Sequence, residues 1–181
     1  MGKAINDVLR AALQVLPPVE GEELVQKNVA DGLKAAMRRL AAGVAVITLA
    51  DGEGLAGTTV SSLTSLCLDP PAVLFCLNQG ASLHDRLLRA DTYAVNLLSA
   101  GQEEVSQRFA AAGPDRFTPG AWETVRGAPC LKGAQANLVC RLAVDLPFGT
   151  HRIIVGKVLW TRVREQTDPL LYADGAYRVL G

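Results

Sequence analysis

Beyond the N-terminal region, the pattern of hydrophobic and polar positions predicts short β-strands. Continuous apolar runs at residues 44–50 and 72–78 predict buried strands, and turn residues 51–54 join the first run to a further strand in a hairpin. Residues 136–146 alternate strictly, and the chain turns at residues 147–149 and returns as a second strand. Further strands are predicted at residues 92–98 and 170–180. Strands joined mainly by hairpins favour a mainly β chain with flanking helices, whose antiparallel sheet closes into a barrel.

Helices are predicted at residues 5–16, 24–40, 82–90 and 101–113. The first ends at Pro17, because proline cannot continue the helical hydrogen bonds. The second carries apolar residues at helical spacing as far as Leu40, with Gly43 as its stop. Ser82, with Asp85 three residues later, predicts a side-chain cap at the start of the third helix.

Length and charge narrow the class of protein. A chain of 181 residues is about the size of one domain, so we expect one compact domain and a tail. The 18 basic residues balance 18 acidic ones, so nothing draws the protein to nucleic acid or to an anionic membrane surface. The apolar runs are too short to span a bilayer, and Asp7 and Arg10 interrupt any signal-peptide core. We therefore expect a cytoplasmic protein.

The cysteines and histidines do not predict a metal site. The cysteines are Cys67, Cys76, Cys130 and Cys140, each in an apolar context and without the close spacing of a zinc site or a redox pair. We interpret them as reduced core thiols. Neither histidine has a second ligand at metal-binding spacing, and His84 is expected to be an exposed residue in the first turn of its helix.

Residues 52–57 spell a literal G-x-G-x-x-G after a strand, the pattern of a dinucleotide-binding loop. In that fold the glycines open a helix that holds the pyrophosphate. Here β-branched and serine-rich residues follow and Pro70 soon stops them, so we interpret the glycines as a hairpin turn.

The hydroxyl-rich stretch after these glycines is the strongest candidate for a binding site. Short side chains with donors and acceptors are found at Thr58, Thr59, Ser61, Ser62, Thr64 and Ser65. Together with main-chain N–H groups they can hold a phosphate or the polar rim of a planar heterocycle. Taken alone, these residues favour an ordinary edge strand with a solvated face, because serine and threonine are common in strands.

Several motifs in order resemble the flavin reductase family that serves two-component flavin-dependent monooxygenases. They are MRRLAAGVAVITL, GTTVSSLTSLCLDPPAVLFCLN, NQGASLHDRL, GAPCLKGAQANLVCRL, GTHRIIVGKV and PLLYADGAYRVL. The resemblance covers roughly residues 33–180. It divides the chain into an N-terminal helical extension, residues 1–30, and a flavin reductase-like domain, residues 31–181.

The resemblance implies a Greek-key split β-barrel that forms a homodimer. It also implies that NADH or NADPH passes a hydride to FAD or FMN, and that a separate monooxygenase receives the reduced flavin. Such a transfer requires stacked rings in a site that excludes water more than it requires an acid or a base.

The same resemblance implies roles for particular residues. The flavin would lie along Thr59, Val60, Ser61 and Ser62. The isoalloxazine ring would meet the main chain of Ser65, Leu66 and Cys67, and the ribityl and phosphate side would meet Asn78, Ala81 and Ser82. Arg116 and Phe117 match a basic and aromatic pair near the flavin, and Tyr177 would line the opening for the nicotinamide. His151 would lie against the nicotinamide cofactor, although its position also fits a surface histidine at a strand end.

The chain departs from the family at two positions. Thr150 precedes His151 where the family commonly has aspartate, and Ser61 stands where asparagine is frequent. We expect these departures to alter nicotinamide affinity and flavin contacts. Two other functions remain open: a flavin-holding electron carrier or reductase of a corrinoid or iron centre on the same fold, and a non-enzymatic dimeric binding module.

Overall fold

The computed structural model describes residues 22–111, 113, 116–165 and 167–180, with the main chain alone for residues 22–26. The chain divides into two compact units, residues 1–39 and residues 40–181. The helix expected at residues 5–16 lies outside the described residues. Within the part that the structure describes, no helix is both long enough and apolar enough to cross a membrane.

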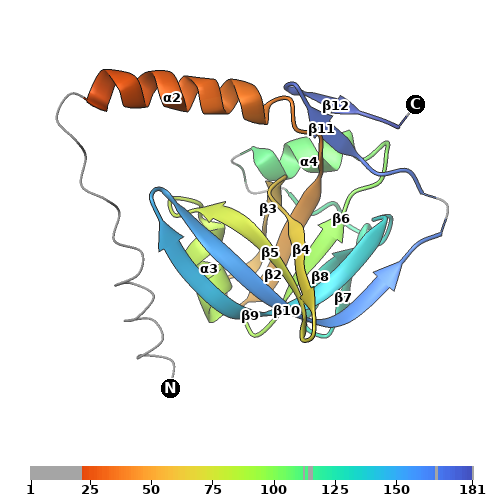
Figure 1. The fold of residues 1–181 in the computed structure, drawn as a ribbon. Helices are drawn as coiled ribbons and strands as arrows, with labels where there is room; N and C mark the ends of the chain where they lie inside the picture. Colours follow the sequence, from red (N-terminus) through yellow and green to blue (C-terminus); the bar gives the residue numbers. More distant parts are fainter. Residues whose placement is uncertain (1–21, 112, 114–115, 166, 181) are drawn as a thin grey trace. The chain divides into compact units, whose positions relative to one another are not determined.

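The first unit contains α2 (Glu22–Met37) (Figure 1). This helix ends before Leu40, and Gly43, expected to stop it, instead lies in strand β1 (Ala42–Gly43). The expectation was wrong because β1 pairs with a C-terminal strand, and Val44 N–H donates to the Leu170 carbonyl at 3.0 Å. Strand pairing distant in sequence therefore overrides the helical spacing.

The second unit is mainly β, as expected, and all its strand pairs are antiparallel. Its 7-stranded sheet has the order β3-β2-β6-β9-β10-β5-β4. These strands are β2 (Ala45–Asp51), β3 (Gly54–Val60), β4 (Thr64–Leu68), β5 (Pro71–Asn78), β6 (Tyr93–Leu97), β9 (Ala136–Phe148) and β10 (His151–Val163). The glycines of the G-x-G-x-x-G lie in the β2–β3 hairpin, which confirms that they do not open a helix.

Two smaller sheets complete the unit. One joins β1 to β11 (Leu171–Ala173) and β12 (Ala176–Arg178), the expected final hairpin. The other is a hairpin of β7 (Trp122–Val125) and β8 (Ala128–Leu131) that the sequence analysis missed. Its strands are short, and Pro129 inside β8 argues against a strand on propensity alone.

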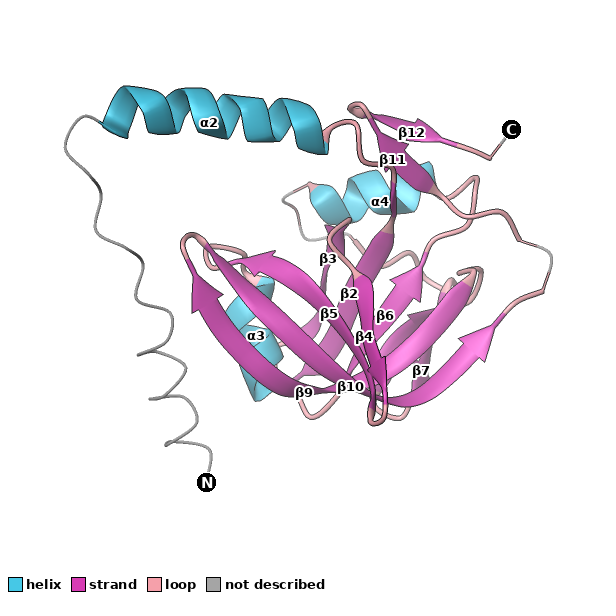
Figure 2. Cartoon of the chain, viewed as in Figure 1, coloured by secondary structure: helices cyan, strands magenta, loops and turns pink. Residues whose placement is uncertain are grey.

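The chain passes from one edge of the large sheet to the other within a short connection. β3 and β4 are the two edge strands, yet only residues 61–63 separate them. A connection of this length spans at most about 15 Å. The sheet therefore curls until its edges approach, and the long strands β9 and β10 bend with it (Figure 2).

The interior of the curled sheet is mainly aliphatic, with the rings of Phe75 and Tyr93 packed among the aliphatic side chains. Phe75 and Tyr93 meet edge to face with ring centroids 6.0 Å apart, and both are fully buried. Tyr93 lies so close to β10 that a Cβ added at Gly156 would sit 1.9 Å from the Tyr93 hydroxyl. Glycine is therefore required at position 156.

A second cluster packs helix α4 (Glu103–Ala110) against β3. Phe109 meets Phe117 at 5.0 Å and Trp122 at 5.4 Å between ring centroids. A Cβ added at Gly57 would lie 2.7 Å from Cε1 of Phe109, so the missing side chain lets the helix approach the strand. This contact brings α4 alongside Thr59 of β3.

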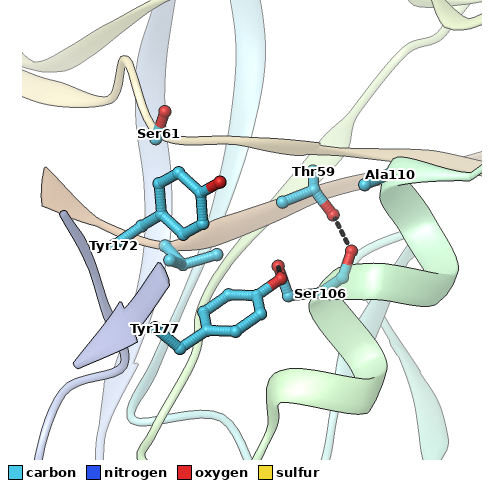
Figure 3. Close-up of a pocket in the computed structure, with 7 residues that line it drawn as sticks. Thr59, Ser61, Ser106, Ala110, Tyr172 and Tyr177 are labelled. Carbon is cyan, nitrogen blue, oxygen red and sulfur yellow. Dashed lines mark hydrogen bonds between the residues drawn. The ribbon is translucent and has the colours of Figure 1, made fainter. Parts of the chain in front are cut away.

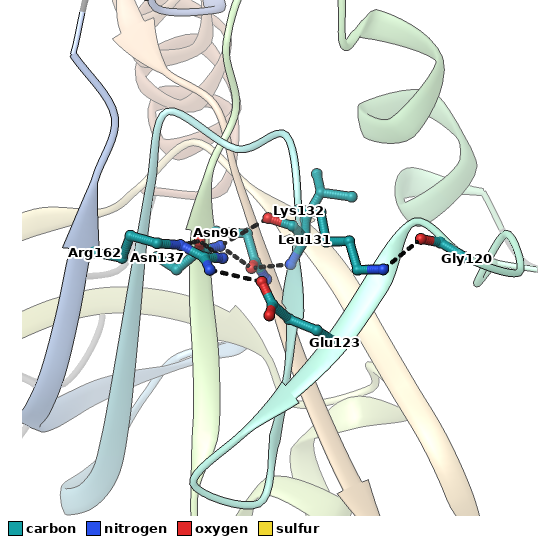
Figure 4. A network of polar contacts seen from close by, with 7 residues as sticks. All are labelled: Asn96, Gly120, Glu123, Leu131, Lys132, Asn137 and Arg162. Atoms are coloured by element: carbon teal, nitrogen blue, oxygen red, sulfur yellow. Dashed lines mark hydrogen bonds and ion pairs between the residues drawn. The ribbon is translucent and has the colours of Figure 1, made fainter.

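Buried amides attach the β7–β8 hairpin to the sheet (Figure 4). The Asn96 Oδ1 atom accepts hydrogen bonds from Leu131 N–H and Asn137 Nδ2, each at 2.8 Å. Arg162 donates to Asn137 Oδ1 through Nε at 3.0 Å and to Glu123 Oε1 through Nη1 at 2.6 Å. Since Asn96 and Asn137 are almost fully buried, these bonds satisfy amides that would otherwise destabilise the fold.

Candidate active site

A groove opens between β3 and β5 and brings together most of the residues expected to bind flavin. Its volume is about 350 Å3. The residues assigned to the site that line it are Thr59, Val60, Ser61, Ser62, Asn78, Ala81 and His151. They are joined by Thr58, one of the candidate hydroxyls of this stretch, and by Cys76 and Leu77, which the sequence analysis did not place in the site. The groove runs along the line where the edges of the curled sheet approach, since β3 and β5 are not neighbours in the sheet order.

Ser62 links the two sides of this groove. Its hydroxyl accepts a hydrogen bond from Cys76 N–H at 3.0 Å and donates to the Cys76 carbonyl at 3.2 Å. The pairing of β4 with β5 extends only as far as Leu74, so the serine side chain takes over where the strand stops pairing. The Ser62 hydroxyl thus has a structural partner as well as a place in the groove.

The other hydroxyl and amide groups of the groove differ in whether they have a partner among the described residues. Among the described residues, the hydroxyls of Thr58 and Ser61 make no hydrogen bond, while Thr59 donates to the Ser106 carbonyl at 2.7 Å. The Asn78 Oδ1 atom accepts a hydrogen bond from Gly80 N–H at 2.8 Å, and this bond engages only the oxygen of the amide. Free hydroxyls and an amide match the hydroxyl and phosphate oxygens of a ribityl phosphate, so this set of donors fits a flavin.

His151 is the first residue of β10 and lies opposite Asn78 of β5 in the strand register. The residue is exposed and lines the groove. Its Nδ1 atom lies 2.9 Å from the Thr150 hydroxyl oxygen, within hydrogen-bond distance. The ring is therefore held at the mouth of the groove by its own chain neighbour.

A second cavity of about 200 Å3 borders the end of β3 and helix α4 (Figure 3). It contains Tyr177, which the sequence analysis placed beside the nicotinamide, and it shares Thr59 and Ser61 with the groove. The Tyr177 hydroxyl donates to Ser106 Oγ at 2.9 Å, and Tyr172 packs on Tyr177 with ring centroids 5.4 Å apart. The pairing of Tyr172 with Tyr177 across the final hairpin was the signal that could have revealed the second tyrosine.

The structure does not place the remaining expected residues on the groove lining. Ser65, Leu66 and Cys67 lie on β4 and are exposed, with a register shift at Leu66 that leaves its main chain without a regular partner. Ser82 is exposed immediately before α3 (Leu83–Arg89).

Arg116 and Phe117 lie behind β3. Arg116 Nη1 donates to the Gly57 carbonyl at 2.6 Å, and its buried Nε has no hydrogen-bond partner among the described residues. The Phe117 ring belongs to the aromatic cluster with Phe109 and Trp122. This pair therefore supports the strand that lines the groove.

Two expectations about α3 were wrong. The Ser82 side chain makes no capping hydrogen bond, and its main chain is already helical with φ −57° and ψ −21°. His84 is buried rather than exposed, because Leu83, His84 and Leu87 form the face of this short helix that packs against the sheet. The helix itself is confirmed, but it presents a different face from the expected one.

The expectation that all the cysteines are core thiols was wrong for part of the set. All of them are free, with Cys130 and Cys140 buried, Cys76 half-buried and Cys67 exposed. Burial raises the pKa of the Cys140 thiol to about 12 and that of Cys130 to about 11. Cys67 differs because it lies on an edge strand, so the apolar residues beside it do not pack against a second layer.

A family model described as a flavin reductase like domain matches residues 37–181. The chain belongs to this family. The resemblance seen in the sequence motifs is thereby confirmed, and the flavin reductase-like match begins close to the boundary between the two compact units.

Named relatives and solved structures agree with this assignment. The reductase component of an FADH2-dependent resorcinol hydroxylase from Rhizobium sp. is 36% identical over 159 residues, which cover 85% of this chain and 89% of the relative. An NADH-dependent flavin reductase from Rhodococcus sp. is 36% identical over 155 residues, covering 82% and 85% of the two chains.

Similarity extends to three-dimensional structure. The NADH:FAD oxidoreductase SgcE6 of Streptomyces globisporus C-1027 superposes with a TM-score of 0.79 at 32% identity, covering 91% of this chain and 97% of that one. The styrene monooxygenase flavin reductase of Pseudomonas putida S12 gives 0.76 at 30% identity, with coverage of 83% and 97%. The flavin reductase-like fold thus includes the strands that form the groove.

Proposed function

We propose that this protein is a flavin reductase that oxidises NADH, reduces FAD or FMN, and hands the reduced flavin to a separate monooxygenase. The groove between β3 and β5 carries the proposal, because unpaired hydroxyls there lie beside His151. The names of the relatives support it, since they include reductase components of monooxygenases and an NADH-dependent flavin reductase.

The residues of the groove bind and orient rather than react. The Thr58 and Ser61 hydroxyls and the Asn78 amide offer hydrogen bonds to the ribityl and phosphate oxygens of a flavin. The buried side chains of Val60 and Leu77 exclude water from one wall. When bound, the flavin supplies the redox chemistry by accepting a hydride from the nicotinamide, so the protein's contribution is alignment of the two rings.

His151 is the residue that would hold the nicotinamide cofactor, and Tyr177 would line the same opening. The two line different cavities, but Thr59 and Ser61 border both, so the cavities adjoin at the end of β3. Ser65, Leu66 and Cys67 would offer main-chain groups from β4, an edge strand in which Ser65 and Cys67 pair with β5 and the register shift leaves Leu66 between them without a partner. Ser82 would add a hydroxyl at the phosphate end.

The fold-level proposals are a Greek-key split barrel, a homodimer and a cytoplasmic location. Curling of the sheet across residues 61–63 supports the barrel. Exposed Leu66 and Leu68 on edge strand β4 support a dimer, because large apolar side chains there gain from burial against a second copy. We infer that residues 1–30 extend from a catalytic domain of residues 31–181.

The decisive experiment is NADH consumption by the purified protein, without flavin and then with FAD or FMN titrated in. Consumption that saturates with added flavin is expected, and the lower KM identifies the preferred flavin. Retention of flavin through gel filtration, with turnover only of an added metal or corrinoid acceptor, would instead favour an electron carrier. No consumption with NADH or NADPH and either flavin would refute the proposed activity.

His151→Ala tests the nicotinamide site separately. Loss of the imidazole removes a contact to the dinucleotide, so the KM for NADH should rise about three- to tenfold, as for loss of one hydrogen bond. The affinity for oxidised flavin, measured by quenching of its fluorescence, should stay within about twofold. Equal losses of both affinities would contradict the assigned role, because that pattern indicates a general disturbance of the groove.

A further inference from the structure

We propose that Thr150 is a positioning residue that holds His151 in one orientation and one tautomer, with its proton on Nε2. This inference rests on the proposed function, since it concerns how the chain presents its histidine to a nicotinamide dinucleotide. It is carried by contacts around the β9–β10 turn.

The main chain of this turn is fixed by one residue at the end of β5. Gln79 N–H donates to the Thr150 carbonyl at 3.0 Å. The Gln79 side-chain amide donates to the Gly149 carbonyl at 3.0 Å and to the His151 carbonyl at 3.3 Å. Gly149 has φ +55°, a conformation that glycine adopts without strain, so the turn is tight as well as pinned. The backbone from which the imidazole projects is therefore well defined.

Among the described residues, the imidazole has one hydrogen-bond partner, the Thr150 hydroxyl 2.9 Å from Nδ1. Because His151 is exposed, burial alone does not fix its side-chain torsions, and this hydrogen bond adds a restraint. A threonine hydroxyl can donate to a bare Nδ1 or accept from Nδ1–H, and we assign it as the donor, which leaves the proton of the neutral ring on Nε2. That proton is then available as a donor to a ligand in the groove.

A threonine at position 150 also differs from an acidic residue because it adds no negative charge beside the groove. A carboxylate at this position would accept a hydrogen bond from Nδ1 and place a negative charge beside the groove. The pyrophosphate of NADH is itself negative, so such a charge repels it. The threonine hydroxyl orients the ring without that repulsion.

Matched variants of the full-length chain test the proposal. Thr150→Val removes the hydroxyl and keeps the shape, whereas Thr150→Ser keeps the hydroxyl. Thr161→Val is the control, because it makes the same change at an exposed position near the other end of β10. We expect Thr150→Val to raise the KM for NADH about three- to tenfold with kcat and flavin KM within about twofold, and Thr150→Ser to restore it. The control should match the wild type.

Nitrogen-15 NMR of the imidazole rings gives a readout that needs no activity. The chain has 2 histidines, so the His151 signals are assigned by their loss in His151→Ala. In the wild type at neutral pH, Nδ1 should carry the shift of an unprotonated, hydrogen-bonded nitrogen. Thr150→Val should give a mixture of tautomers, and Thr150→Ser should return the single form.

The outcomes separate this proposal from the proposed function. If the wild type consumes no NADH, while its single tautomer still becomes a mixture in Thr150→Val, the reductase activity is refuted and the positioning role stands. An unchanged tautomer and an unchanged KM in Thr150→Val would overturn the positioning role. So would a KM that Thr150→Ser fails to restore. If Thr150→Val loses its cooperative unfolding transition, Gln79→Leu, which releases the turn carbonyls, should raise the KM for NADH in the same way, and an unchanged KM there also overturns it.

Discussion

Tyr93 combines a closely packed ring with a polar hydroxyl group in the core. Its ring is fully buried, and its hydroxyl has no hydrogen-bond partner among the described residues. Burial consequently raises the pKa of this phenol far above its usual value. The hydroxyl occupies the space that a side chain at Gly156 would need. Tyrosine and glycine are thus matched in shape, while the oxygen loses its water without compensation.

Tyr93→Phe should therefore keep or raise the free energy of unfolding, by up to about 1 kcal/mol, because it removes an unpaired buried polar atom. Gly156→Ala should lower it by about 1–3 kcal/mol through overpacking. In the double variant part of that loss should return, since the clashing oxygen is gone. Urea unfolding of the four proteins measures the cycle. Additive effects would show that the two residues do not compete for the same space.

At the residue scale, the sequence predicted which residues line the groove better than it predicted their hydrogen bonds and burial. The hydroxyls of Thr59 and Ser61 were expected in the site and lie there, but nothing local indicated that Ser62 would bond to Cys76 across the groove. His84 was expected to be exposed because a polar residue in a first helical turn usually is. Its burial depends on which face of α3 meets the sheet, and a helix of 7 residues is too short to reveal a face by periodicity.

At the scale of elements, an ion pair ties α3 to the β2–β3 hairpin. Arg86 Nε donates to Asp51 Oδ2 at 2.9 Å, and Arg86 Nη2 donates to the Gly54 carbonyl at 2.7 Å. The hydrogen bond from Arg86 holds the pKa of Asp51 below its usual range. A carboxylate with a lowered folded-state pKa stabilises the fold above its unfolded-state pKa, and this contribution is lost as the pH falls through the folded-state value.

Arg86→Leu should accordingly remove part of the acid dependence of stability. Its free energy of unfolding should lie below that of the wild type at neutral pH, and the difference should shrink as the pH falls below the ordinary range of a carboxyl group. Urea unfolding across this range is the measurement. Arg89→Leu is the matched control, because its partner Glu53 is well exposed and the pair contributes little. A difference between Arg86→Leu and wild type that is independent of pH would contradict the role of Asp51.

Elements were predictable where their pattern is long and local. The hairpins of β2 with β3 and of β9 with β10 follow from apolar runs and turn residues, and both are present. The sequence analysis missed β1 and the β7–β8 hairpin because such short strands are stabilised by distant partners. β1 pairs with β11, and the hairpin is bound by the buried amides of Asn96 and Asn137. No local pattern encodes such distant pairing.

At the scale of the molecule, the buried hydrophobic residues that the structure describes lie between Val44 and Leu170, inside the second compact unit. The family match also begins at residue 37. The motifs that resemble the family in the sequence start near the same place. The edge-to-edge curl of the sheet was less accessible, since it depends on the pairing of β5 with β10 across a long separation in the chain.

A chain lacking residues 1–39 should therefore still unfold in one cooperative transition, because its core is complete. It should also retain NADH consumption with a flavin KM within about threefold of the full chain, since every residue of the groove remains. Circular dichroism on heating and the NADH assay are the measurements. A broad transition together with lost activity would show that the N-terminal unit is required for folding.

The Ser62 bridge has a consequence for how quickly the protein can give up what it binds. A ligand in the groove touches β3 and β5, which are not hydrogen-bonded partners, and the contact across them is made by a side chain. The ligand can depart without the breaking of any interstrand main-chain bond, and a hydroxyl reorients far faster than a sheet opens. The residence time of the ligand is then set by its own contacts with the groove. This suits a reductase whose reduced product must leave before it reacts.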